Sequence, residues 1–265
     1  MLFFPFKADI PLSRIPFLTI SVMIACLFLY SAQKDMGEAV FESVGEFCAA
    51  KEGRVHRIVM EKLSRPSDTS EQHTCVRAVS ALHFSNDRDE TLAALLEGTT
   101  SSFSIMTLEE THEYIRDYLI EIYDAFKVGA PVPLTQRMQY EPESYNVATM
   151  ITSAFAHGGW DHVIGNLFFF FAFAATVEII LGYVLFPLVF SALAIGTSLS
   201  YSLVVAQTAD SLPTIGLSGV VMGMIGLFVY FVPREKVVCF FWFFLAFGKI
   251  GVPAWMLAVW FVGWH

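Results

Sequence analysis

Charge almost disappears from the second half of the chain. Between Val147 and Val232, only Asp161, Glu178 and Asp210 carry a formal charge. Because an ionised side chain is costly in hydrocarbon, such a stretch predicts several membrane-spanning helices. The whole chain is 55% apolar and has a mean hydropathy of +0.57, as in a membrane protein with several spans rather than a soluble domain.

The first apolar segment, 15–32, predicts a retained transmembrane helix. Lys7 and Arg14 precede it, as in a signal peptide, but Tyr30 occupies a position where a cleavage site needs a small residue. Further spans are expected at 160–181, 183–206, 217–232 and from about 252. The apolar residues between the last two, from Val237, predict an interfacial segment.

These spans predict an all-α polytopic membrane protein in three parts. They are an N-terminal segment with the first span (1–32), a hydrophilic and mostly helical insertion (33–146), and a membrane core (147–265). From Lys34 to Glu143 there are 20 acidic and 11 basic residues, so the insertion accounts for the net charge of −9. The missing basic face argues against nucleic-acid binding.

Basic residues in the loops predict the orientation. Lys7, Arg14, Arg234 and Lys236 are expected on the cytoplasmic side, and the loop around Asp210 has no Lys or Arg. The N-terminus is then cytoplasmic and 33–146 lies outside. In that compartment Cys48 and Cys75 either form a disulfide or remain two free thiols.

The insertion has clear helical signals but no catalytic motif. A capping box at Thr107–Glu110 predicts the start of one helix. Breaks between helices are expected at 65–70, 97–102 and 129–133. Four histidines lack metal-ligand spacing and are interpreted as solvated surface residues: His56, His73, His83 and His112.

One motif places a hydroxyl among glycines at the start of an apolar helix. The stretch PTIGLSGVVMGMIG contains Ser218 within GLSG. In an earlier span, His162 and Asn166 are four residues apart and therefore share a helix face. Polar residues in a bilayer helix are functional candidates, and interhelical hydrogen bonding is the alternative.

Depth in the membrane brings these residues to one level. At about 1.5 Å per residue, Ser218 lies about 24 Å from Arg234 along its helix. His162 lies about 24 Å from Glu178, which also marks the cytoplasmic side. In a hydrocarbon core about 30 Å thick, Ser218, His162 and Asn166 are expected to converge near the outer surface.

A serine in the first turn of a helix has free backbone N–H groups beside it. With an amide and an imidazole N–H, Ser218 forms a candidate nucleophile with an oxyanion hole. Gly216 and Gly219 would let a substrate backbone come close. Alternatively, the glycines that follow Ser218 serve helix packing, and Val220 distinguishes the motif from the soluble G-x-S-x-G elbow.

GLSG, together with H-x4-H-x3-N at His157, His162 and Asn166, resembles the rhomboid intramembrane serine proteases. The likeness covers nearly all of the chain outside 33–146. It implies a six-helix core, of which five spans are expected here. It also implies that Ser218 is the nucleophile, that His162, Asn166 and the Ser218 N–H stabilise the oxyanion, and that His157 supports the site near its mouth.

The sequence departs from that family at two points. The family's Trp-Arg pair is absent from the residues before His157. The family's general base is a histidine in an Ala-His-x-x-Gly context on a sixth span, whereas His265 is the only histidine after Ser218. We expect the base beyond residue 265 and a Ser-His dyad, with Asp161 capping its helix and Asp210 in a loop.

The leading hypothesis is an endopeptidase that cuts transmembrane helices of other proteins near their outer ends, in a bacterial inner (plasma) membrane. Its partners would be those helices and the lipid bilayer, and no metal or organic cofactor is expected. The alternative is a catalytically inactive rhomboid-like protein that binds membrane helices. A transporter or channel is disfavoured, because the spans contain no further charged pathway. The substrate, the role of 33–146 and the oligomeric state are left open.

Overall fold

The computed structural model describes residues 2–8, 13–85, 87–205, 211–243, 246–257 and 259. The chain divides into two compact units, Met1–Gln33 with Leu134–His265, and Lys34–Pro133. Residues 134–146 therefore belong with the apolar unit, although the sequence groups them with the insertion. A backbone bridge between Tyr140 and Thr214, and a hydrogen bond between the hydroxyls of Tyr140 and Ser202, hold this segment there.

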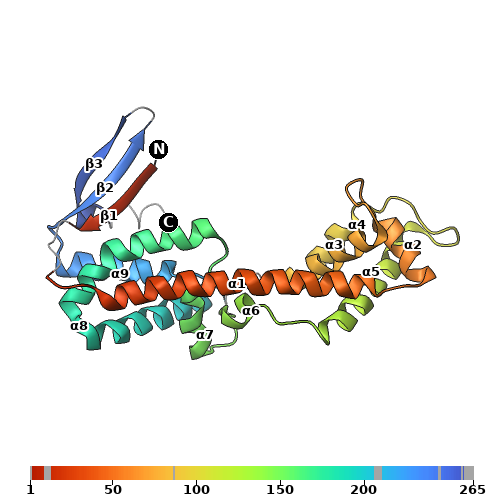
Figure 1. The fold of residues 1–265 in the computed structure, drawn as a ribbon, viewed down its shortest axis with the longest axis horizontal. Helices are drawn as coiled ribbons and strands as arrows, with labels where there is room; N and C mark the ends of the chain where they lie inside the picture. The colour runs from red at the N-terminus through yellow and green to blue at the C-terminus, as the bar shows by residue number, and fades with distance from the viewer. Residues whose placement is uncertain are drawn as a thin grey trace. The chain divides into compact units, whose positions relative to one another are not determined.

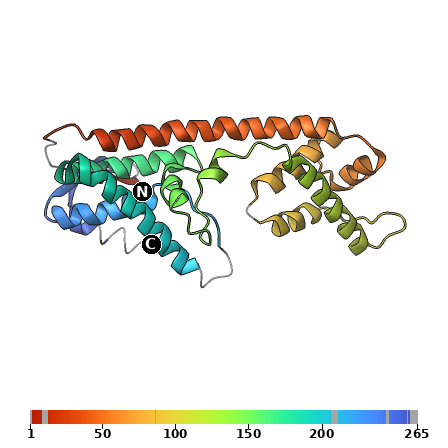
Figure 2. The same cartoon turned by 90° about the horizontal axis from the view of Figure 1, so that it is seen from below.

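Helices dominate the apolar unit, and among the described residues two helices are long and apolar enough to cross a membrane. These are α1 (Phe17–Ala49) and α8 (Trp160–Val205), while α9 (Ser218–Phe231) is apolar but shorter. Gly182 has a φ of 77° inside α8 and separates 160–181 from 183–205. Figures 1 and 2 show the chain changing direction within α8. The shorter helices of this unit are α6 (Leu134–Met138), α7 (Val147–Thr152) and the 3-10 turn η1 (Ser153–Phe155).

A three-stranded antiparallel sheet corrects the all-α prediction. Strand β1 (Leu2–Ala8) pairs with β2 (Lys236–Phe243), which pairs with β3 (Ala246–Pro253). The segment expected to be interfacial is therefore a β-hairpin (Figure 1), because VVCFFWF is rich in β-branched and aromatic residues that favour strands. Of the fifth span expected from about 252, residues 252 and 253 belong to the end of β3, residues 254–257 and 259 are helical, and the rest lies outside the described residues.

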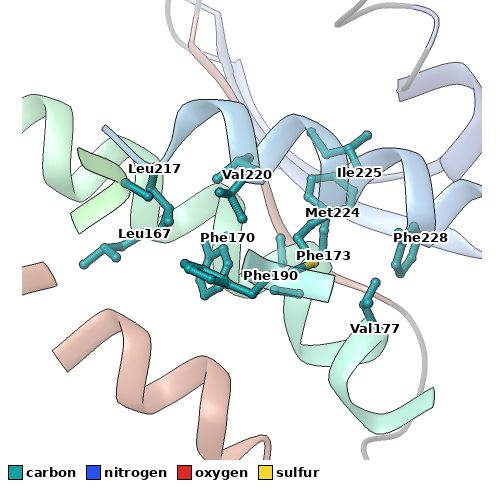
Figure 3. Packing of buried hydrophobic residues seen from close by; sticks show 14 of the residues in the cluster. Leu167, Phe170, Phe173, Val177, Phe190, Leu217, Val220, Met224, Ile225 and Phe228 are labelled. Atoms are coloured by element: carbon teal, nitrogen blue, oxygen red, sulfur yellow. The ribbon is translucent and has the colours of Figure 1, made fainter. Parts of the chain in front are cut away.

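The core of this unit lies between α8 and α9. Leu217, Val220, Met224 and Phe228 recur about every fourth residue and are buried against α8 (Figure 3). The rings of Phe173 and Phe228 meet edge to face, with centroids 5.3 Å apart. The two helices therefore start at the same end of the unit and run side by side.

Glu178 joins α8 to the start of α1. This side chain is fully buried, and its carboxylate accepts hydrogen bonds from Leu18 N at 3.0 Å and from Thr19 N and Oγ1, each at 2.7 Å. It thereby caps N–H groups that have no partner within α1 and places negative charge at the positive end of that helix. Arg14 donates to the carbonyl of Ile179 at 3.0 Å beside it.

Replacing Glu178 by glutamine is expected to lower the stability of the fold. The amide NH₂ would face N–H donors, leaving buried groups unpaired at a cost of about 1–3 kcal/mol. We expect a lower thermal unfolding midpoint for the full-length protein in detergent micelles. The exposed Glu113→Gln makes the same chemical change and should leave the midpoint in place. Equal midpoints for the two variants would contradict the role of Glu178 as a cap.

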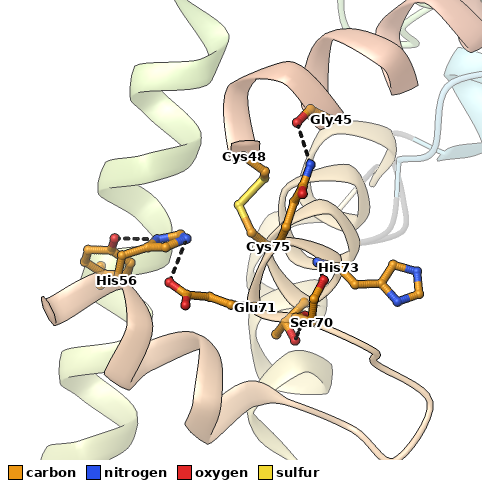
Figure 4. The surroundings of a disulfide bond; sticks show 10 residues. Gly45, Cys48, His56, Ser70, Glu71, His73 and Cys75 are labelled. Carbon is orange, nitrogen blue, oxygen red and sulfur yellow. Dashed lines mark hydrogen bonds and ion pairs between the residues drawn. A yellow bond between two sulfur atoms is a disulfide. The ribbon is translucent and has the colours of Figure 1, made fainter. Parts of the chain in front are cut away.

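The second unit is a small helical domain with its own apolar core. It contains α2 (Arg54–Leu63), α3 (Glu71–Phe84), α4 (Arg88–Leu96) and α5 (Leu108–Lys127). The capping box predicted at Thr107 and Glu110 is present. A disulfide between Cys48 and Cys75, which the sequence left open, joins the end of α1 to α3 (Figure 4).

The interpretation of four surface histidines is wrong for His56. That side chain is only 3% exposed, and its Nδ1 lies 2.8 Å from the hydroxyl of Tyr118. His83 is also packed inward, with Phe84 and Phe126 rings at 5.4 Å, and within the described chain neither of its ring nitrogens has a hydrogen-bond partner. Burial lowers the pKa of His83, and Lys127 lowers it further.

Acidification should weaken this unit through His83. Its folded pKa is lowered below the ordinary value, so the unfolded chain binds the proton first and stability falls as pH drops below about 6.5. We expect His83→Phe, which keeps a ring and cannot bind a proton, to reduce the loss of thermal stability between about pH 7.5 and about pH 5. The exposed His73→Phe is the control, and an equal reduction in that variant would contradict the assignment.

Candidate active site

Ser218 is the first residue of α9, beside backbone N–H groups with no partner in the helix. The first bond of the i to i−4 ladder runs from Val221 N to Leu217 O at 2.9 Å, so the N–H groups of residues 218–220 precede it. No side chain caps this helix start. The arrangement leaves donors and the positive end of the helix dipole next to a serine hydroxyl.

Gly216 lies in close contact with His162. It has a φ of 117°, and a Cβ added there would lie 2.8 Å from both Cε1 and Nε2 of the imidazole. Its N–H donates to the carbonyl of Ser153 at 2.8 Å, which holds the loop before α9 in place. Both the backbone conformation and the close approach therefore require glycine at this position.

His162 is oriented by its own loop. The N–H of Gly158 donates to Nδ1 at 3.4 Å, so Nδ1 is an acceptor and the neutral imidazole carries its proton on Nε2. Nε2 is the atom against Gly216, on the approach to Ser218. The imidazole is therefore placed to donate a hydrogen bond toward the start of α9.

Asn166 lies one turn further along α8. Its Nδ2 donates one hydrogen bond to the carbonyl of His162 at 2.9 Å, which fixes the amide and leaves its second N–H available. The side chain is nearly buried, at 9% exposed, and Nδ2 would lie 3.9 Å from a Cβ on Gly216. The amide and the imidazole thus point at the same loop.

Two cavities meet at Ser218. A cavity of about 300 Å³ is lined by Asp161, His162, Gly165, Asn166, Phe169, Ser218, Val221, Met222 and Ile225. The structure therefore brings together the three residues predicted to converge. A second cavity, of about 210 Å³, borders Ser218 between α8, α9 and η1, and its polar lining includes Ser153, Thr197 and Thr214.

Two supporting residues have surroundings that differ from those predicted: Gly219 is expected to let a substrate backbone come close, and His157 is expected near the mouth of the site. Gly219 faces α8, where an added Cβ would lie 2.9 Å from Thr197, so close helix packing explains this glycine. His157 is only 2% exposed, and its ring meets that of His162 edge to face at 5.2 Å. It supports His162 from within the protein.

Asp161 lies in the first turn of α8 and has no capping hydrogen bond within the described chain. The cap predicted for this residue is therefore absent, and the residue lines the larger of these two cavities instead. Asp210 and His265 lie outside the described residues. No group of three or more potential metal ligands occurs among the residues that are described.

Gln33 holds the histidine segment and was missed in the sequence. Its amide accepts from His157 N at 3.1 Å and donates to His157 O at 3.3 Å, and it also donates to Thr135 Oγ1 at 2.7 Å. The only sequence signal is an amide directly after the apolar residues 15–32. Pairing with a segment 124 positions away gives no local pattern.

Comparison with known families agrees with this geometry. Residues 144–265 match the model of the rhomboid domain. This part of the chain is a rhomboid domain. No curated protein and no solved structure matches the chain significantly. Rhomboid membership and the apolar helices indicate an integral membrane protein, either an intramembrane protease or an inactive relative.

Replacing Gln33 by leucine should loosen the rhomboid site without unfolding the protein. Buried N–H and C=O groups of His157 would lose their partner, at a cost of about 1–3 kcal/mol. We expect faster amide hydrogen exchange in residues 155–162 of the full-length protein in detergent micelles. Gln136→Leu, an exposed glutamine on α6, is the control and should leave that exchange unchanged. Unchanged exchange in Gln33→Leu would contradict the role of Gln33 in holding the backbone of His157.

Proposed function

We propose that the protein is a serine endopeptidase that cleaves transmembrane segments of other membrane proteins near their outer ends. One observation carries the proposal: Ser218, His162 and Asn166 line a single cavity at the N-terminal ends of two apolar helices. A nucleophile, two side-chain donors and free backbone N–H groups are the components that acyl transfer requires.

The chemistry follows from these positions. Oγ of Ser218 attacks the scissile carbonyl carbon, the C=O electron pair moves to the oxygen, and a general base takes the hydroxyl proton. The oxyanion receives hydrogen bonds from the Ser218 N–H, from Nε2–H of His162 and from Nδ2–H of Asn166. The C–N bond then breaks, the leaving amine takes the proton from the base, and water hydrolyses the acyl-enzyme to restore Ser218.

The family resemblance assigns the base to a histidine on a sixth span. No metal or organic cofactor takes part in this scheme. The substrate helix must unwind locally, because a peptide bond inside an intact helix is shielded from attack. In the proposed topology the polar end of the cavity faces the outer side, and water would enter from there.

The proposed topology has a cytoplasmic N-terminus and the insertion outside, in a bacterial inner membrane. The disulfide between Cys48 and Cys75 supports it, since disulfides persist in oxidising compartments. The loop charges at Arg14 and Arg234 favour the same orientation. Substrates would approach laterally through the lipid bilayer.

Ser218→Ala should lower cleavage of a model transmembrane substrate by about a thousandfold or more. The assay uses the full-length protein in proteoliposomes, with gel separation of the products. Ser200→Ala, on an exposed face of α8, is the matched control and should cleave as the wild type does.

Two results would contradict the proposed protease function. One is cleavage that survives in Ser218→Ala. The other is a folded wild-type protein that cleaves no substrate, and binding of the transmembrane segment by that protein would favour the inactive relative.

A further inference from the structure

The cavity at Ser218 has one polar end and one apolar end. Its α8 lining lies on successive turns from Asp161 through Gly165 to Phe169, and its α9 lining runs from Ser218 to Ile225. At about 1.5 Å per residue, the cavity extends about 10–12 Å along both helices. The polar groups lie at the helix starts, and the apolar side chains lie further along.

Asp161 carries the only formal charge among the described residues that line this cavity. The side chain is exposed, and within the described part of the chain it makes no hydrogen bond or ion pair. His162 and Asn166, which also line the cavity, each make a hydrogen bond with a backbone group that sets the orientation of the side chain. The unpaired carboxylate of Asp161, in the cavity that also contains Ser218, therefore needs a separate explanation.

Asp161 gives the cavity a negative charge that a bound substrate would cover from water. A cation in that substrate would gain an ion pair with the carboxylate, whereas an anion would be repelled. Outer ends of membrane helices carry few Lys and Arg residues, so a basic residue there is a discriminating feature. An extended chain covers about 3.3–3.6 Å per residue, so the cavity spans about three substrate residues.

We infer that Asp161 selects substrates with a Lys or Arg within about three residues of the scissile bond, at the outer end of their transmembrane segment. The basic side chain pairs with Asp161, and apolar substrate residues lie against Phe169, Met222 and Ile225. The inference rests on the proposed protease function, whose substrate class it narrows. A purely structural role, in which Asp161 only favours the positive end of α8, would give no preference for substrate charge.

The test compares three model substrates that differ in one outer residue, Lys, Gln or Glu, with that residue scanned over three neighbouring positions. The full-length protein is assayed in phosphatidylcholine proteoliposomes. The wild type should cleave the Lys form at a kcat/KM about threefold or more above the Gln form, with the Glu form slowest. The difference should shrink at high salt.

Variants separate charge selection from a structural effect. Asp161→Asn should give similar kcat/KM values for the three substrates, and Asp161→Lys should prefer Glu over Lys. Asp35→Asn removes one exposed negative charge outside the cavity and should keep the wild-type order. An unchanged order in both Asp161 variants, or a changed order in Asp35→Asn, would overturn the inference.

Binding of the same substrates to Ser218→Ala, measured by crosslinking, distinguishes failure of the Asp161 inference from failure of the proposed protease function. Cleavage by the wild type without a charge preference rejects the role of Asp161 and leaves the protease standing. If the wild type cleaves none of the substrates but Lys-dependent binding disappears in Ser218→Ala/Asp161→Asn, the protease fails and charge selection stands.

Discussion

The apolar unit depends on polar groups that are buried at both ends of the contact between α1 and α8. At one end, Glu178 receives the N–H groups of Leu18 and Thr19, and at the other Gln33 pairs with the backbone of His157. Helices packed in hydrocarbon gain little from hydrophobicity alone, because lipid tails are as apolar as their side chains. Satisfied buried polar groups therefore determine which helix faces meet and in what register.

At the candidate site, by contrast, polar backbone groups are left without a partner. At the start of α9, the N–H groups of residues 218–220 are left without intrahelical partners, next to a cavity. Such groups are costly when buried and dry, but they are useful where an oxyanion forms. His157, Gln33 and Ser153 hold the loops on either side, so contacts within the protein fix the orientation of the donors.

The insertion is stabilised in a different way. Its helices bury an apolar core of their own, begin at capping residues such as Thr107, and are joined to the end of α1 by the disulfide at Cys48. Asp68 adds a short ion pair with Arg77 at 2.9 Å. A unit with this composition is suited to water, which agrees with the acidic balance of residues 34–143.

Much of the helical organisation was predictable from sequence, because periodicity, caps and glycine breaks act over a few residues. The capping box at Thr107 and the start of an apolar helix at Ser218 are such local features. The shared depth of Ser218 and His162 also followed from rise per residue. The pairing of Gln33 with His157, the burial of His83 and the sheet of β1 with β2 each join segments that are distant in sequence or packed from several sides. Their free energy comes from contacts that exist only after the chain has folded, and for that reason the local sequence did not show which segments would meet.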